Sequence, residues 1–488
     1  MPASVTLTAP LDPPIQFGTD GWRGIIADDF TLARLRRVVP VAAQVLAQTY
    51  GGEATRNLIV VGYDRRFLSE QFAAATAEAV AQAGFDVLLA DTFAPTPALS
   101  WAVKQYQALG ALVITASHNP GIYSGLKVKG AFGGSVPPSI TQKIQTELLL
   151  EAAPPNPSVG SIQAFNPWPD YCRELQTKVD LSTIQQAIAQ GQLAVFVDVM
   201  HGATAGGMAQ VLNQPVQELN CDRDPLFGGG APEPLPKYLA PLLQTLKTPP
   251  KQPGQLRVGF VFDGDGDRIA AVDGQGQFLS SQILIPILID HFATRRGARG
   301  EVIKTVSGSD LIPRIAALHQ LNVFETPIGY KYIAERMLEH NPILLGGEES
   351  GGIGYGNHIP ERDGLLSALY LLEAIAQSGQ DLSQLYQQLQ AQTGYQCVYD
   401  RIDLPLASTD VQARLIHQLQ TTPFTQILDQ SVLECSTQDG FKFRLADQSW
   451  LLIRFSGTEP VLRLYCEAHS PEQVVQLLGW AKAWAIAA

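Results

Sequence analysis

The sequence predicts an α/β protein with three similar α/β domains, whose sheets are mixed or parallel, and a C-terminal α+β domain. Three observations support this prediction. The length of 488 residues is enough for about three domains of ordinary size. Apolar runs of strand length alternate with helical stretches in three successive parts of the chain and end in polar loops. The last hundred residues contain strand-like runs that follow one another closely, as in an antiparallel sheet.

The first part of the chain, residues 1–155, has the pattern of a parallel sheet. NLIVVGYD (57–64), FDVLLAD (85–91) and ALVITASHNP (111–120) are apolar runs that helical stretches separate. The helix predicted over 69–84 has Ser69 as its N-cap and Gly84 just beyond its last residue. Continuous apolar strands that alternate with helices indicate a parallel sheet covered on both faces.

The same pattern returns twice after the proline-rich segment 151–161. The second domain is predicted over 156–278 and the third over 279–392. Their strands run into polar loops, namely LAVFVDVMHGAT (193–204), LRVGFVFDGDGDR (256–268), EVIKTVSGSD (301–310) and PILLGGEESGG (342–352). The fourth domain, 393–488, ends in a helix that begins at Ser470 and Pro471, which suit the N-cap and the first helical position. Ligands bind beyond the carboxyl ends of strands in open parallel sheets, so these loops are the expected sites.

Composition and charge exclude several classes of protein. The net charge of −12 disfavours a nucleic-acid partner, because a phosphate backbone binds to a basic face. The five cysteines form no CxxC pair, which indicates reduced thiols and not a disulfide framework or a zinc site. No apolar run approaches the roughly 20 residues of a membrane span, and the N-terminus lacks the features of a signal peptide. We therefore expect a soluble, cytoplasmic protein.

The segment DGDGDR (263–268) places three carboxylates, Asp263, Asp265 and Asp267, at the end of an apolar strand. Two carboxylates about 4 Å apart repel by roughly 4 kcal/mol at an effective dielectric near 20. A calcium-binding EF-hand loop is excluded because Arg268 and Gly274 occupy positions that need glycine and glutamate. A solvated acidic turn remains the simple alternative. Hard oxygen ligands without nearby Cys or His favour Mg²⁺.

Three other loops carry chemistry only in combination. TASHNP (115–120) exposes Ser117 beside His118, and Lys127 follows within the next loop, SGLKVKG (124–130). In GGEESGG (346–352), Glu348, Glu349 and Ser350 suit hydrogen bonds to sugar hydroxyls, although a plain turn is as good an interpretation. RFSGTEP (454–460) offers a guanidinium, hydroxyls and backbone amides for a phosphate, but a hairpin turn fits it equally well.

In this order, the motifs from FGTDGWRG (17–24) to RFSGTEP resemble the α-D-phosphohexomutases, the family of phosphoglucomutases and phosphomannomutases. The resemblance covers nearly the whole chain and implies four domains around a central cleft. It implies that Ser117 carries the transferable phosphoryl group and that Ser117, Asp263, Asp265 and Asp267 bind one Mg²⁺ per chain. It also implies that Arg23, His118 and Lys127 act near the reacting oxygen, with Lys127 as the candidate general acid/base. The remaining residues that the resemblance implies for substrate binding are Arg268, Lys331, Glu348, Ser350, His358, Arg454, Ser456, Gly457 and Thr458.

The activity that this resemblance implies is that of a phosphoglucomutase. It would interconvert glucose 1-phosphate and glucose 6-phosphate, with glucose 1,6-bisphosphate as intermediate and activator. The Glu-Glu-Ser sequence is closer to the glucose type than to the Glu-Met-Ser of dual-specificity members, whereas Ser124 stands where many relatives carry Asn. A dual-specificity phosphoglucomutase/phosphomannomutase, a glucose 1,6-bisphosphate synthase and a non-catalytic sugar-phosphate-binding protein are the alternatives. We expect hexose phosphates as the only partners, in a monomer or weak dimer whose last domain closes on the substrate.

Overall fold

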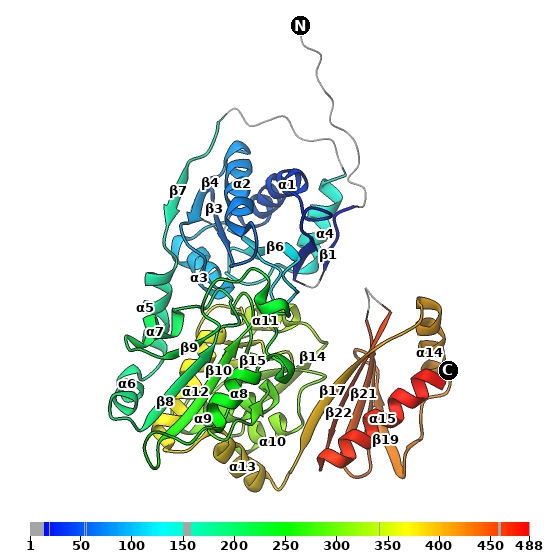
Figure 1. Cartoon of the computed structure of the whole chain (residues 1–488). Helices are drawn as coiled ribbons and strands as arrows, with labels where there is room; N and C mark the ends of the chain where they lie inside the picture. The colour runs from blue at the N-terminus through cyan, green and yellow to red at the C-terminus, as the bar shows by residue number, and fades with distance from the viewer. Residues whose placement is uncertain are drawn as a thin grey trace.

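The computed structural model describes residues 14–18, 20–52, 54, 56–149, 158–340, 342–456 and 460–487. It contains four β-sheets, three of them sandwiched by helices in an elongated body and the fourth set to one side (Figure 1). This arrangement confirms the predicted three α/β domains and C-terminal α+β domain. Among the described residues, no helix is both long and apolar enough to cross a membrane.

The first sheet has seven strands in the order β1-β2-β6-β5-β3-β4-β7. Strands β5, β3, β4 and β7 are parallel, while β6, β2 and β1 are antiparallel to their neighbours. The strands are Phe17–Gly18 (β1), Gly21–Ile25 (β2), Leu58–Tyr63 (β3), Asp86–Ala90 (β4), Gly110–Ile114 (β5), Tyr123–Gly130 (β6) and Ile162–Phe165 (β7). The helices are Leu32–Tyr50 (α1), Ser69–Gln82 (α2), Thr96–Tyr106 (α3) and Pro138–Glu147 (α4).

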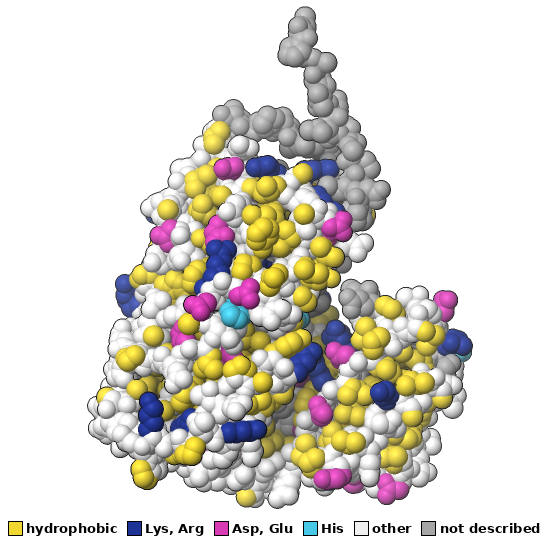
Figure 2. Space-filling model, viewed as in Figure 1, with side chains coloured by type: hydrophobic (Ala, Val, Ile, Leu, Met, Phe, Trp, Pro, Cys, Tyr) yellow, Lys and Arg dark blue, Asp and Glu magenta, His cyan; other side chains and the backbone are white. Residues whose placement is uncertain are grey.

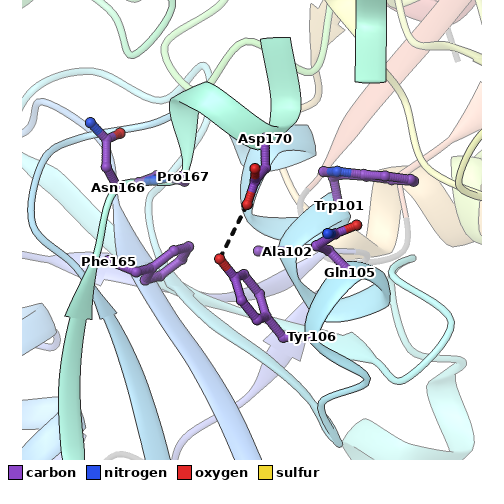
Figure 3. A pocket seen from close by; sticks show the side chains of 8 residues that line it. All are labelled: Trp101, Ala102, Gln105, Tyr106, Phe165, Asn166, Pro167 and Asp170. Carbon is purple, nitrogen blue, oxygen red and sulfur yellow. Dashed lines mark hydrogen bonds between the residues drawn. The ribbon is translucent and has the colours of Figure 1, made fainter. Parts of the chain in front are cut away.

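Strand β7 lies beyond residue 155, where we predicted the first domain to end, and yet it pairs with β4. The chain then enters the second domain beside α3, where the Tyr106 hydroxyl donates to Asp170 Oδ2 at 3.2 Å (Figure 3). This bond joins α3 of the first domain to the helix over Trp168–Lys178, with which the second domain begins.

The second sheet has the order β12-β11-β10-β8-β9, with β10, β8 and β9 parallel and the other two strands antiparallel. Its strands are Leu193–Asp198 (β8), Gln217–Leu219 (β9), Leu256–Phe262 (β10), Ile269–Val272 (β11) and Phe278–Leu279 (β12). Its helices are Trp168–Lys178 (α5), Leu181–Ala189 (α6), Gly207–Leu212 (α7) and Ala240–Lys247 (α8), with short 3-10 turns at Phe227–Gly229 and Pro236–Tyr238.

The third sheet has the order β14-β13-β15-β16, of which the first three strands are parallel. Its strands are Glu301–Thr305 (β13), Val323–Thr326 (β14), Ile343–Gly347 (β15) and Ile353–Tyr355 (β16). Its helices are Ser281–Thr294 (α9), Leu311–Leu318 (α10), Tyr330–Glu339 (α11), Gly364–Ser378 (α12) and Leu382–Thr393 (α13). One continuous apolar core extends through the three α/β domains.

The C-terminal sheet is antiparallel throughout, in the order β17-β22-β21-β20-β19-β18. Its elements are Val398–Pro405 (β17), Thr409–Thr421 (α14), Gln426–Ile427 (β18), Gln430–Ser436 (β19), Phe441–Leu445 (β20), Trp450–Phe455 (β21), Val461–Ala468 (β22) and Pro471–Ala487 (α15). This domain has an apolar core of its own. A hollow separates it from the body, and Lys and Arg side chains lie along that hollow (Figure 2).

Candidate active site

The three aspartates of the sequence motif form one buried cluster at the end of β10. Asp263, Asp265 and Asp267 have no exposed surface, and a ligand atom of each lies within 4.8 Å of the others. Burial and the two neighbouring carboxylates raise the pKa of Asp263 well above its ordinary value. Burial and like charge thus disfavour the ionised form of Asp263, and a cation bound here would relieve both effects.

The unpaired atoms of the cluster fit a hard metal ion. Asp265 Oδ1 and Asp267 Oδ1 are buried and have no hydrogen-bond partner, which is rare for carboxylate oxygens inside a protein. All ligands are oxygens, the donor set that Mg²⁺ prefers. The cluster can therefore bind a divalent cation through these open atoms, and we call residues 263–268 the metal loop.

Ser117 lies against this cluster although 146 residues of chain separate it from Asp263. Its hydroxyl donates to Asp263 Oδ2 at 2.7 Å, and its backbone has a left-handed φ of 51°. Gly264 makes this approach possible, because a Cβ at that position would lie 2.4 Å from the Ser117 carbonyl oxygen. A hydroxyl in a strained loop beside a metal-binding cluster can accept and return a phosphoryl group.

Lys127, on β6, is buried among three carboxylates. Its Nζ lies 2.7 to 2.8 Å from the side chains of Asp20, Asp265 and Asp267. Although burial opposes the charge, these acids raise the pKa of Lys127 above its ordinary value. In this arrangement the ammonium compensates the acidic cluster, and its role as a general acid/base stays a prediction.

Arg23 and His118 flank the serine. Arg23 Nη1 donates to Asn119 Oδ1 at 2.5 Å, within the loop that carries Ser117. His118 Nδ1 lies 3.5 Å from Ser117 Oγ. Desolvation and the neighbouring cations, first Arg268 and then Arg23, lower the pKa of His118 well below its usual value. The imidazole is therefore neutral and can hold or release a proton.

The glycine-framed loop of the third domain, residues 346–352, lies directly beside the metal loop, and we call it the sugar loop. Ile269 N donates to Gly351 O at 2.9 Å, and Arg268 forms a β-bridge with Gly352. Ser350 Oγ donates to Glu348 Oε1 at 2.7 Å, and burial raises the pKa of Glu348. Two of the predicted sugar contacts, Glu348 and Ser350, are thus bonded to each other, and their loop is bonded directly to the metal loop that carries the acidic cluster.

Three other predicted substrate residues, Arg268, Lys331 and His358, have different surroundings. The Arg268 guanidinium lies near the acidic cluster, with its Nε 4.0 Å from Asp267 Oδ1. Lys331, at the first turn of α11, has its ammonium over the Tyr332 ring at 4.9 Å. His358 has a buried side chain, 3.2 Å from Asp363 and stacked on Trp101. The role of His358 in substrate binding stays a prediction.

The predicted phosphate loop follows β21. Arg454 Nε donates to Asp439 Oδ1 at 3.0 Å, and Ser456 N donates to Val461 O at 2.9 Å. Gly457 and Thr458 lie outside the described residues. The end of β21 is the end of the C-terminal sheet that faces the first domain (Figure 1), on the side of the hollow.

Comparison with known proteins accounts for all four domains. Models of phosphoglucomutase/phosphomannomutase alpha/beta/alpha domains I, II and III match residues 14–153, 169–276 and 280–393, and the C-terminal domain of the same family matches 405–478. The chain belongs to the phosphoglucomutase/phosphomannomutase family. Family members shift a phosphate within a sugar phosphate, so this protein is a phosphohexomutase-type isomerase.

Relatives within the phosphoglucomutase/phosphomannomutase family carry different substrate names. A phosphoglucomutase/phosphomannomutase of Thermococcus kodakarensis is 28% identical over 95% of this chain and 96% of its own. A phosphoglucosamine mutase of a Thermotoga species is also 28% identical, over 95% and 97%. A crystal structure from Thermus thermophilus, which carries the name phosphomannomutase, is 34% identical with a TM-score of 0.83, over 97% of this chain and 99% of that one.

Sequence reasoning missed the residues that hold this family site in shape. The Arg66 guanidinium donates five hydrogen bonds, to Asp64 Oδ2 and to the carbonyl oxygens of Ser117, Asn119, Pro120 and Tyr123. Four carbonyls of the serine loop, by which we mean residues 115–122, and of the first residue of β6 thus converge on one fully buried cation. The signal was present, because Arg66 lies three residues beyond an apolar strand that ends at Tyr63, where a charged residue faces the ligand edge of the sheet.

Two further missed residues join the domains. Arg362 Nη2 lies 2.7 Å from both Asp20 Oδ2 and Asp267 Oδ2, and its Nη1 lies 3.3 Å from Glu348 Oε1. Asp20 belongs to the motif FGTDGWRG, in which only Arg23 had been assigned a role. Arg362 connects the first domain, the metal loop and the sugar loop, and no local pattern predicts such a contact.

Proposed function

We propose that the protein is a phosphoglucomutase that interconverts glucose 1-phosphate and glucose 6-phosphate through phosphoserine 117. The observation that carries this proposal is the 2.7 Å hydrogen bond from Ser117 Oγ to Asp263. It brings a nucleophilic hydroxyl, a metal-binding cluster and several cations into one buried site. Phosphoryl transfer needs this combination, because its catalysis depends mainly on positioning and on electrostatic stabilisation.

In the transfer step, the bond between phosphorus and Ser117 Oγ breaks while a bond forms from phosphorus to the free sugar hydroxyl. The hydroxyl proton leaves the sugar oxygen and finally reaches Ser117 Oγ, which ends as a neutral alcohol. His118 and Lys127 are the proposed proton carriers. Arg23 and Arg268 balance the charge of the phosphoryl oxygens. The three aspartates and an oxygen of the serine would hold Mg²⁺, which would supply further charge stabilisation to the transferred phosphoryl group.

The same residues bind the sugar in either orientation. Glu348 accepts hydrogen bonds from neighbouring hydroxyls of the sugar, and Ser350 can donate to them or accept from them. The phosphate that does not react is held by Arg454, Ser456, Gly457 and Thr458. After the first transfer, the 1,6-bisphosphate turns over and returns its other phosphate to Ser117. A bisphosphate synthase would use the same groups but release this intermediate.

The sugar preference rests on two different observations. The Glu-Glu-Ser sequence of the sugar loop favours glucose. The relatives named phosphoglucosamine mutase, which match 95% of the chain, favour glucosamine 1-phosphate and 6-phosphate as the second candidate. A dual glucose and mannose specificity is the third. We further propose a cytoplasmic protein that acts as a monomer or weak dimer.

The test combines mass spectrometry with a substrate panel. We expect the purified protein to carry one phosphate on Ser117 and to have its highest kcat/KM with glucose 1-phosphate, in Mg²⁺ and a trace of glucose 1,6-bisphosphate. Mannose 1-phosphate and glucosamine 1-phosphate are the competing substrates. Full turnover by Ser117→Ala would refute the phosphoserine route. Net accumulation of bisphosphate from an external bisphosphate donor would favour the synthase.

A further inference from the structure

The middle residue of the Glu-Glu-Ser sequence points away from its neighbours. Glu348 and Ser350 bond to each other beside Arg362. Glu349 Oε2 instead accepts hydrogen bonds from Ser307 Oγ at 2.6 Å and from Thr305 Oγ1 at 3.2 Å. The sequence had suggested that both carboxylates bind sugar hydroxyls. The structure separates them, because successive residues of this turn face different elements.

Glu349 contacts the loop that follows β13, residues 306–310, which we call the docking loop. The N-terminus of α9 holds both loops in place. Ser281 Oγ donates to the carbonyl oxygens of Glu348 and Glu349 at 2.9 and 3.0 Å. Gln282 Nε2 donates to Ser307 O at 3.1 Å, and Gln282 Oε1 accepts from Ser309 N at 2.7 Å. The sugar loop and the docking loop therefore form one hydrogen-bonded unit.

The other side of the docking loop carries the C-terminal domain. Lys442 Nζ donates to Val306 O at 2.7 Å. Asp310 N donates to Glu467 Oε1 at 2.9 Å, and Arg444 pairs with the Asp310 carboxylate. Val306 also belongs to a small apolar cluster with Trp450, Leu452 and Tyr465 of the C-terminal sheet. These polar and apolar contacts all join the third domain to the fourth.

These contacts are suited to transmit a displacement. Thr305 and Ser307 are fully buried and their hydroxyl oxygens lie 3.0 Å apart, so without the Glu349 carboxylate one of the two hydroxyl protons would lack an acceptor. Glu349 also acts on the C-terminal domain through charge. Although burial opposes it, acidic groups that include Tyr465 and Glu349 raise the pKa of the Arg401 guanidinium on β17.

We propose that Glu349 is a positioning residue that ties the sugar loop to the docking loop and so couples sugar binding to the placement of the C-terminal domain. This inference rests on the proposed function, because it takes residues 346–352 as the sugar-binding loop and the loop after β21 as the phosphate-binding loop. The two must keep a fixed separation to hold one hexose phosphate at both ends. Glu349 sets that separation without touching the substrate.

A double-mutant cycle tests the tie. We expect Ser307→Ala to raise the KM for the hexose phosphate by about tenfold, the loss of one hydrogen bond to a carboxylate. Glu349→Ala also removes the bond from Thr305 and should raise KM at least as much, and both variants should show a smaller change in kcat. The double variant should be no worse than Glu349→Ala alone, because that substitution already removes the Ser307 contact. Glu335→Ala, which removes an exposed glutamate of α11 in the same domain, is the matched control and should leave KM unchanged.

Hydrogen exchange supplies a readout that a merely structural residue would not change. In the wild-type protein, bound glucose 6-phosphate should slow exchange at the amides of Ser309 and Asp310, and this slowing should be lost in Glu349→Ala. Additive effects in the cycle would overturn the proposal. So would a change of sugar preference in Glu349→Ala that Ser307→Ala lacks, or a lower melting temperature with normal KM and normal exchange. A wild-type protein that binds glucose 6-phosphate without turnover would refute the proposed function. Its hydrogen exchange with and without glucose 6-phosphate would still show whether Glu349 couples the sugar loop to the docking loop.

Discussion

Gly264 keeps the metal loop and the serine loop in contact, and an added methyl group there should separate them. A Cβ on Gly264 would lie 2.4 Å from Ser117 O and 2.9 Å from Pro232 Cγ. Ordinary van der Waals contact begins near 3.4 Å, so the serine loop would have to move by about 1 Å. A misplacement of this size can cost about 100-fold in rate, which corresponds to roughly 2.7 kcal/mol of transition-state stabilisation.

The expected result for Gly264→Ala is therefore a fall of about 100-fold in kcat/KM, with the circular dichroism of a folded protein. Steady-state kinetics with glucose 1-phosphate measure the fall. Gly274→Ala is the matched control, because its Cβ would meet its nearest neighbour, Arg257 O, at 3.4 Å, an ordinary contact. If Gly264→Ala kept its kcat/KM within about threefold, corresponding to less than 1 kcal/mol, the close approach of the two loops would not matter for catalysis.

Three other perturbations have defined outcomes. Arg66→Lys leaves three donors for five acceptors, so at least two acceptors lose their partner. The free energy of unfolding, measured in urea, should fall by about 2 kcal/mol or more. An unchanged urea midpoint would contradict the role of Arg66 in holding the loop of Ser117. Chelation by EDTA should abolish turnover, and added Mg²⁺ at 100 times its Kd should raise the free energy of unfolding by about 2.7 kcal/mol. Asp265→Asn should lose this response to Mg²⁺, whereas a response that survives the substitution would place the ion elsewhere. Burial, followed by Lys304, lowers the pKa of Lys442 from 10.5 to about 7, so the unfolded chain binds more protons between these values. Relative to Lys442→Met, the free energy of unfolding of the wild-type protein should rise by about 1.4 kcal/mol per pH unit from pH 7 to 10, and a flat difference would contradict the neutral, buried amine.

Local patterns predicted the elements and the acidic cluster well. A metal site could be predicted at Asp263, Asp265 and Asp267 because the repulsion among three closely spaced carboxylates follows from the segment 263–268 alone. Ser470 and Pro471 begin α15 as predicted, and Ser470 Oγ accepts from Gln473 N. The N-cap predicted at Ser69 was wrong by one position. Leu68 has a left-handed φ of 60° there, and the Ser69 hydroxyl donates to Asp64 Oδ1 at 2.9 Å in place of capping.

Contacts between distant segments could not be predicted in this way. The pairing of Ser117 with Asp263 followed only from a family resemblance, because composition and periodicity carry no information about which loops meet. Arg66, Asp20 and Arg362 were missed for the same reason, since each acts on atoms of distant segments. Glu349 was assigned to the sugar because adjacent carboxylates look equivalent in sequence, whereas in the structure Glu348 bonds to Ser350 and Arg362 and Glu349 bonds to Thr305 and Ser307.

The separate cores of the body and of the C-terminal domain have a consequence for how the protein melts. The three α/β domains share one apolar interior, so they should unfold together as one cooperative unit. The C-terminal domain has its own interior and joins the body through a small apolar cluster and polar bonds. Calorimetry should therefore resolve two heat-absorption peaks, and limited proteolysis between α13 and β17 should release two fragments that each stay compact.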